Sequence, residues 1–109
     1  MKGKVVLIPF PFTDLTTAKL RPALVIYEGK RDVIVAFISS KISSESSDAD
    51  ILITKERAGF KRTGLKVDSV VRLDKIATVL KDLVVGELGE LDEEIRGEVN
   101  QKLREILKI

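Results

Sequence analysis

Short runs of apolar and β-branched residues recur from the start of this 109-residue chain to residue 80, and polar or turn-forming residues bound each run. Such runs are typical of β-strands. Six strands are predicted, at Val5–Pro9, Ala23–Tyr27, Val33–Ser39, Ala49–Thr54, Ser69–Leu73 and Ile76–Leu80. A hairpin turn is predicted at Glu28–Asp32, which contains a glycine. So many strands in so short a chain favour a closed or half-closed barrel, because closure hides unpaired strand edges.

The last part of the chain has the period of a helix. Apolar residues recur at helical spacing at Leu91, Ile95, Val99, Leu103, Ile106 and Leu107. Asp92 belongs to the residue types that cap helix N-termini. One amphipathic helix is therefore predicted, and its apolar stripe is either a lid on the barrel or part of a dimer interface. A chain of 109 residues with 44% apolar content can bury one core, so residues 1–109 are predicted to form a single, mainly β domain with a C-terminal helix.

The chain contains neither cysteine nor histidine. This excludes disulfides, zinc–thiolate sites, thiol nucleophiles, Ser-His-Asp triads and histidine-ligated metals. Any catalysis must use Arg, Lys, Asp, Glu or hydroxyl groups, and no cofactor or metal is expected. The sequence also lacks a signal peptide and an apolar span of about 18 residues, which predicts a cytoplasmic protein that does not enter a membrane.

Charge is distributed unevenly along the chain. Residues 1–75 hold 14 Lys and Arg against 9 Asp and Glu, a net +5, whereas residues 76–109 hold 5 against 8, a net −3. A basic body with an acidic tail suits a polyanionic ligand on one surface. The alternative is that these charges serve ordinary solubility.

Arg21 is the first candidate for chemistry. It stands directly before Pro22, which disfavours helical geometry at the preceding residue and favours an extended backbone. The guanidinium is therefore expected at the mouth of a strand, where it suits a phosphate.

Three further candidates follow from strand geometry. Ser39 ends an apolar strand, so its hydroxyl is expected where the strand leaves the core, although most serines at such places only hydrogen-bond a strand terminus. Arg72 and Asp74 are two apart in a predicted strand and would share a face. Their alternative role is a surface ion pair, which is worth about 0–1 kcal/mol.

The segment Val5–Ile26, VVLIPFPFTDLTTAKLRPALVI, joins a strand through a loop of Pro and Phe residues to a strand that begins Arg-Pro. It resembles the opening of the MazF/PemK family of toxin ribonucleases. The resemblance continues in the apolar strand that ends on Ser39 and Ser40, in the V-V-R-L-D segment Val70–Asp74, and in the closing helix, so it covers nearly the whole chain. The family usually has Thr where this chain has Ser39, and serine keeps the hydroxyl but loses the methyl group that fixes its rotamer.

The resemblance implies a small SH3-like, PemK-type β-barrel and the endoribonuclease toxin of a type II toxin–antitoxin pair. It further implies a homodimer, a cognate antitoxin with an acidic, partly disordered tail, and metal-independent cleavage of single-stranded RNA. In that reaction the ribose 2′-OH attacks the adjacent phosphorus and leaves a 2′,3′-cyclic phosphate and a 5′-OH. The implied roles are charge stabilisation by Arg21 and Arg72, proton abstraction by Asp74 and phosphate orientation by Ser39. A guanidinium is a poor proton donor, so its electrostatic role is favoured over an acid role.

RNA recognition would fall to the exposed loops, since single-stranded bases stack on aromatic side chains and hydrogen-bond to polar groups. The candidates are Phe12, Thr13, Asp14, Thr16, Thr17, Lys19, Ser40, Lys41, Lys61 and Arg62. The basic segment Lys55–Lys66, which is predicted as a loop, would supply further positive charge. For Phe10 and Phe12 the alternative is that they fold back into the core, because prolines flank them.

Two other functions remain open on the sequence. A catalytically weak or inactive member of the family would act as a binding module for RNA or antitoxin. The gyrase-poisoning toxins share the fold, but they depend on a C-terminal aromatic residue, and this chain ends LREILKI.

Overall fold

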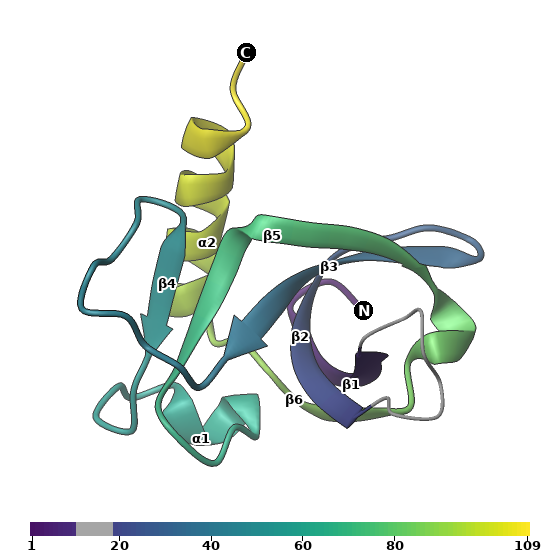
Figure 1. The fold of residues 1–109 in the computed structure, drawn as a ribbon, viewed down its shortest axis with the longest axis horizontal. Helices are drawn as coiled ribbons and strands as arrows, with labels where there is room; N and C mark the ends of the chain where they lie inside the picture. Colours follow the sequence, from purple (N-terminus) through teal and green to yellow (C-terminus); the bar gives the residue numbers. More distant parts are fainter. Residues whose placement is uncertain (11–18) are drawn as a thin grey trace.

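Six strands form one antiparallel sheet that curls on itself (Figure 1). The computed structural model describes residues 1–10 and 19–109. The strands are β1 (Lys4–Phe10), β2 (Lys19–Glu28), β3 (Asp32–Ser39), β4 (Asp50–Ile53), β5 (Ser69–Leu80) and β6 (Gly86–Glu90). They are ordered β4-β5-β3-β2-β1-β6, and each neighbouring pair is antiparallel. The predicted mainly β, barrel-like class is confirmed.

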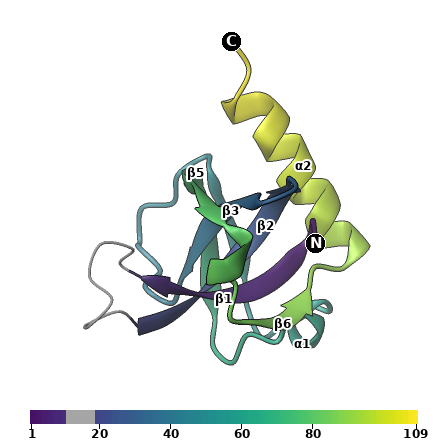
Figure 2. The ribbon, with the colours of Figure 1, turned by 90° about the vertical axis from the view of Figure 1, so that its right-hand side faces the viewer.

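The C-terminal helix α2 (Glu93–Ile106) packs across one face of the curled sheet (Figure 2). The predicted N-cap is confirmed, because the Asp92 carboxylate accepts a hydrogen bond from the backbone N–H of Ile95 at 2.9 Å. The helix ends at Ile106, so Leu107 of the predicted stripe lies just beyond it. Ile95 and Val99 are buried in the same apolar cluster as Val5, and the stripe therefore covers the core. None of the helices in the two described ranges is long and apolar enough to cross a membrane.

A second apolar cluster lies on the opposite face of the central strands. Val5 contributes to the cluster beneath α2, whereas its neighbour Val6 contributes to the second one. Leu24 and Val25 divide in the same way. This alternation is what a strand that is buried on both faces requires, and it explains why the predicted strands read as almost continuous apolar runs.

The prediction of two separate strands at Ser69–Leu73 and Ile76–Leu80 was wrong, because they form the single strand β5. Its pairing with β3 jumps between Phe37, which lies opposite Arg72, and Ala36, which lies opposite Ile76. The intervening residues 73–75 therefore bulge from the β3–β5 ladder. The polar residues that suggested a break in the sequence mark this bulge instead.

Two elements were missed. The segment Lys55–Lys66 was predicted as a loop, yet it contains the one-turn helix α1 (Phe60–Thr63), and β6 was not predicted. The Gly64 residue that follows α1 has φ +75°, and a Cβ atom there would overlap the carbonyl of Leu88 in β6. Glycines weaken the strand signal in the sequence of this region, but here they allow the backbones of α1 and β6 to pack closely.

The remaining predicted boundaries hold with small changes. The hairpin turn at Glu28–Asp32 is confirmed, and the Gly29 N–H donates to the Asp32 carbonyl at 2.8 Å. The strand β4 is shorter than the predicted Ala49–Thr54. Since β2 begins at Lys19, four residues before the predicted start, Arg21 lies inside a strand.

Candidate active site

A groove opens where β2 and β3 part. The two strands pair from Glu28 opposite Val33 as far as Ala23 opposite Phe37. Beyond that point β2 continues to Lys19 along β1, and β3 continues to Ser39 along β5. The groove between these separated ends has a volume of about 980 Å³.

The four candidate catalytic residues all line this groove. Arg21 comes from β2, Ser39 from the end of β3, and Arg72 and Asp74 from β5. Arg21 and Asp74 are exposed, whereas Ser39 and Arg72 are half-buried. Residues 21 and 74 are 53 positions apart in the sequence. The four side chains meet in one groove because β2, β3 and β5 converge on it.

Ser39 and Arg72 are tied to the first turn of the β3–β4 connection. The Ser39 hydroxyl oxygen accepts a hydrogen bond from the Lys41 backbone N–H at 3.0 Å. Arg72 Nη2 donates a hydrogen bond to the Lys41 carbonyl at 3.3 Å. Ser39 thus has the expected role at a strand terminus, yet its O–H can still donate to a ligand. Most N–H groups of the Arg72 guanidinium also stay available, since that group has five donors.

Arg72 and Asp74 do not form the surface ion pair considered from the sequence; among residues 1–10 and 19–109 no ion pair joins them. The bulge at residues 73–75 explains this, because the rule that residues two apart share a face holds only in a regular strand. Within the same ranges, Arg21 likewise has no carboxylate within 4 Å.

Phe10 forms part of the apolar lining. Its ring packs edge-on against that of Phe37, with centroids 5.4 Å apart and an interplanar angle of 62°. Phe10 is 42% exposed, so the alternative in which it folds into the core is wrong. Leu65, Val67 and Ile76 add further apolar surface. The groove therefore combines apolar walls with charged and hydroxyl groups.

The groove is strongly cationic. In the described part of the chain, five cationic side chains and one carboxylate line it. The cations are Arg21, Lys41, Lys66, Arg72 and Lys75, and the carboxylate is Asp74. None of the ion pairs between described residues involves any of the six. A groove with this excess of positive charge suits an anionic ligand.

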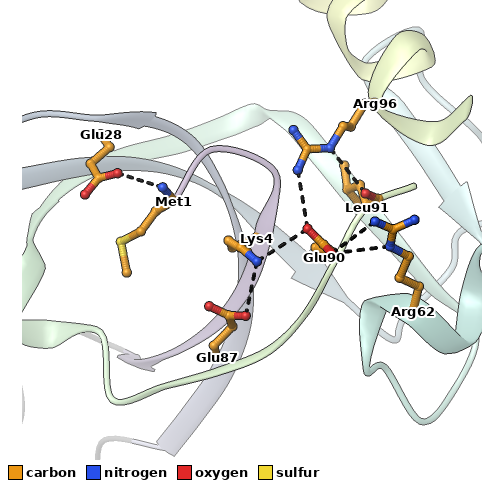
Figure 3. A network of polar contacts seen from close by, with 8 residues as sticks. All are labelled: Met1, Lys4, Glu28, Arg62, Glu87, Glu90, Leu91 and Arg96. Carbon is orange, nitrogen blue, oxygen red and sulfur yellow. Dashed lines mark hydrogen bonds and ion pairs between the residues drawn. The ribbon is translucent and has the colours of Figure 1, made fainter. Parts of the chain in front are cut away.

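One network of paired charges lies away from the groove, around Glu90 (Figure 3). The Glu90 carboxylate contacts Arg62 Nη2 at 3.1 Å, Lys4 Nζ at 3.4 Å and Arg96 Nη2 at 3.7 Å. Hydrogen bonds from Arg62 and Lys4 lower the pKa of Glu90, and the hydrogen bond to Glu90 raises the pKa of Lys4. The network joins α1, β1 and α2 to β6, and it explains how the acidic C-terminal part is partly compensated by the basic body.

A second ion-pair group ties the N-terminus to β2. The terminal ammonium of Met1 lies 2.6 Å from the Glu28 carboxylate, and Lys81 Nζ lies 2.9 Å from its other oxygen. Hydrogen bonds from these two groups lower the pKa of Glu28 to about 2.

The predicted RNA-binding residues are only partly gathered at the groove. Ser40 and Lys41 line it. Lys19 and Lys61 are exposed but outside its lining, and Arg62 is engaged by Glu90. The other five, Phe12, Thr13, Asp14, Thr16 and Thr17, lie outside the described residues.

Lys66, the last residue of the basic segment Lys55–Lys66, lines the groove, and so does Lys75, which was not singled out from the sequence. The available signal was weak. Lys75 follows Asp74 at the polar interruption between two apolar runs, and Lys66 ends a basic segment. Among the described residues, no three Asp or Glu side chains gather in a way that would hold a metal ion.

The chain is similar in sequence to one known protein family and in fold to several solved structures. Residues 1–107 match the profile of a family described as PemK-like, MazF-like toxins of type II toxin–antitoxin systems. No curated protein sequence matches the chain.

Three solved structures illustrate the structural similarity. An endoribonuclease in complex with its cognate antitoxin from a mycobacterial species aligns with a TM-score of 0.75 at 17% identity, over 100% of this chain and 95% of the other. The Mycobacterium tuberculosis toxin MazF-mt6 gives 0.75 at 15% identity, over 97% of each chain. A MazE–MazF structure from Deinococcus radiodurans gives 0.73 at 19% identity, over 98% and 94%. At these identities the likeness shows a shared fold.

Proposed function

Because the chain belongs to the family of PemK-like, MazF-like toxins of type II toxin–antitoxin systems, we propose that it is an endoribonuclease that cleaves single-stranded RNA in the groove between β2 and β3. The observation that carries this proposal is the convergence of Arg21, Ser39, Arg72 and Asp74 on one groove whose cations are not neutralised by described carboxylates.

The reaction needs no histidine if charge stabilisation provides most of the rate enhancement. The Asp74 carboxylate accepts the proton of the ribose 2′-OH, and that oxygen attacks the adjacent phosphorus. The bond from phosphorus to the 5′-oxygen breaks, and water supplies a proton to the leaving oxygen. The products are a 2′,3′-cyclic phosphate and a 5′-OH, and no metal ion takes part.

Arg21 and Arg72 stabilise the transition state. The pentavalent phosphorus carries more negative charge than the substrate phosphate, so guanidinium groups bind it more tightly than they bind the ground state. The Ser39 hydroxyl donates a hydrogen bond to a non-bridging oxygen and orients the phosphate. The half-buried positions of Ser39 and Arg72, both tied to Lys41, favour fixed placement of these two donors.

The same groove is suited to bind the RNA nucleotides on either side of the cleaved bond. Single-stranded nucleic acid binds where cations follow the backbone and aromatic faces stack on the bases. The cations are Lys41, Lys66 and Lys75. The aromatic face is the exposed Phe10 ring, which lies beside Phe37.

We further infer a cytoplasmic homodimer that is inhibited by a cognate antitoxin. Two of the similar structures contain an antitoxin, and a cationic groove suits an acidic segment of such a partner. Sedimentation of the purified 12.1 kDa chain tests dimerisation, since a particle of monomer mass at micromolar concentration would contradict it. Fractionation of the native cells tests the compartment, and recovery in a membrane fraction would contradict it.

The catalytic proposal is tested with a long single-stranded RNA in excess EDTA. We expect cleavage by the wild type and by Arg31→Ala, and none by Arg21→Ala. Arg31 is the matched control, because it is an exposed arginine at the β2–β3 turn outside the groove. Intact RNA that is retarded in a gel would instead indicate a binding module without activity.

A further inference from the structure

Asp50 has a buried carboxylate oxygen whose hydrogen bonding the fold does not satisfy. Its Oδ2 accepts a hydrogen bond from the Ser47 N–H at 3.1 Å. Its Oδ1 is buried and has no hydrogen-bond partner among the described residues. A buried carboxylate oxygen without a partner is unfavourable, so such an atom in a folded protein calls for an explanation.

The strand register places this carboxylate beside Arg72. Asp50 of β4 lies directly opposite Arg72 of β5, and Phe37 of β3 lies opposite Arg72 on the other side. Residues that are directly opposite in antiparallel strands share a face, with Cβ atoms about 5 Å apart. Asp50 and Arg72 therefore occupy one row on the face that carries Phe37 and the groove.

Arg72 has donors to spare in this row. Its Nη2 donates to the Lys41 carbonyl, and the remaining N–H groups have no acceptor among the described residues. No ion pair within 4 Å joins Asp50 to Arg72. The carboxylate and the guanidinium are thus neighbours across two strands, and each has unused hydrogen-bonding capacity.

We propose that Asp50 is a positioning residue for Arg72. The carboxylate attracts the guanidinium through a partly buried region, where charges are screened less than in water, and so fixes the direction in which Arg72 enters the groove. This role rests on the proposed function, because it matters only if Arg72 faces the reacting phosphate.

The substitution Asp50→Asn isolates the charge. Asparagine has nearly the same shape, and its side-chain oxygen can still accept the hydrogen bond from Ser47, so the turn that precedes β4 is kept. Asp48→Asn is the matched control, because Asp48 is exposed, lies two residues away and makes no side-chain hydrogen bond or ion pair within the described ranges.

The first test uses no RNA. ¹³C-detected NMR of Arg72 Nε and Cζ, assigned with Arg72→Lys, reports the surroundings of the guanidinium directly. We expect Asp50→Asn to shift these signals and Asp48→Asn to leave them in place. Equal, negligible shifts in both variants would overturn the inference, whatever the function of the groove.

The second test uses RNA cleavage. We expect Asp50→Asn to lower kcat by about tenfold with little change in KM, because a small misplacement of a group that binds the transition state acts on kcat. In the Arg72→Lys background the same substitution should have no further effect, whereas a general loss of structure would lower activity in both backgrounds. A kcat equal to that of Asp48→Asn would contradict the positioning role. Absence of cleavage by the wild type would instead refute the proposed function and leave the NMR test decisive.

Discussion

The charge of the groove predicts how strongly RNA binding depends on salt. Five cationic side chains line the groove, and in the described chain none is neutralised by an ion pair. Each phosphate contact to single-stranded nucleic acid contributes a slope of about −0.7 to log K against log[salt]. Five contacts would give a slope of about −3.5, so a rise from about 50 mM to about 200 mM salt should weaken binding roughly a hundredfold.

This prediction is measured by fluorescence anisotropy with a 2′-O-methyl RNA oligomer, which lacks the attacking hydroxyl and stays intact. Lys66→Gln removes one groove cation and should make the slope shallower by about 0.7. Lys30→Gln removes the same charge from the exposed β2–β3 turn, outside the groove, and should leave the slope unchanged. A wild-type slope shallower than about −1, or equal effects of the two substitutions, would refute the assignment of this groove as the polyanion site.

Three further predictions concern stability. Arg57 donates to the Leu52 carbonyl at the outer edge of β4 and pairs with a carboxylate of α2, so Arg57→Ala should lower the free energy of unfolding by about 1–2 kcal/mol and free that edge for self-association. Urea unfolding and light scattering measure these effects, and unchanged values in both would contradict the expectation. The depressed pKa of Glu28, about 2 against an ordinary 4.5, means that its carboxylate adds stability above pH 4.5 that is lost as the pH falls toward 2. The stability difference between wild type and Glu28→Gln should therefore shrink over this interval, and a constant difference would count against the ion pairs. Gly64→Ala should cost about 1–3 kcal/mol, because φ is +75° and a Cβ would overlap β6, whereas Gly97→Ala in α2 meets open space and should stabilise by up to about 1 kcal/mol. Thermal unfolding distinguishes the two, and shifts in the same direction would be inconsistent with this packing.

The elements that the sequence predicts correctly are those whose signal is local. The strands β1, β2 and β3 are apolar runs that are buried on both faces, and α2 has its own cap and apolar stripe. In contrast, β6 is rich in glycine and glutamate and exists because it pairs with β1 and packs against α1. Such an element depends on contacts between distant segments, which a local pattern does not contain.

The same distinction applies to the site. Arg21, Ser39 and Arg72 were selected from short local motifs, and all three line the groove where β2 and β3 separate. The basic segment around Arg62 gave a misleading signal, because its partner Glu90 lies 28 residues away in sequence. The bulge that carries Asp74 and separates it from Arg72 likewise depends on pairing with β3.

The central claim is that the groove between the separated ends of β2 and β3 cleaves RNA by attack of a 2′-OH. Its most direct test is mass spectrometry of the products from an oligonucleotide with a single ribose among deoxyribose residues, incubated in EDTA. We predict a 2′,3′-cyclic phosphate and a 5′-OH at that ribose for the wild type and for Arg31→Ala, and no product for Arg72→Ala. A 5′-phosphate end, or undiminished cleavage by Arg72→Ala, would contradict the account.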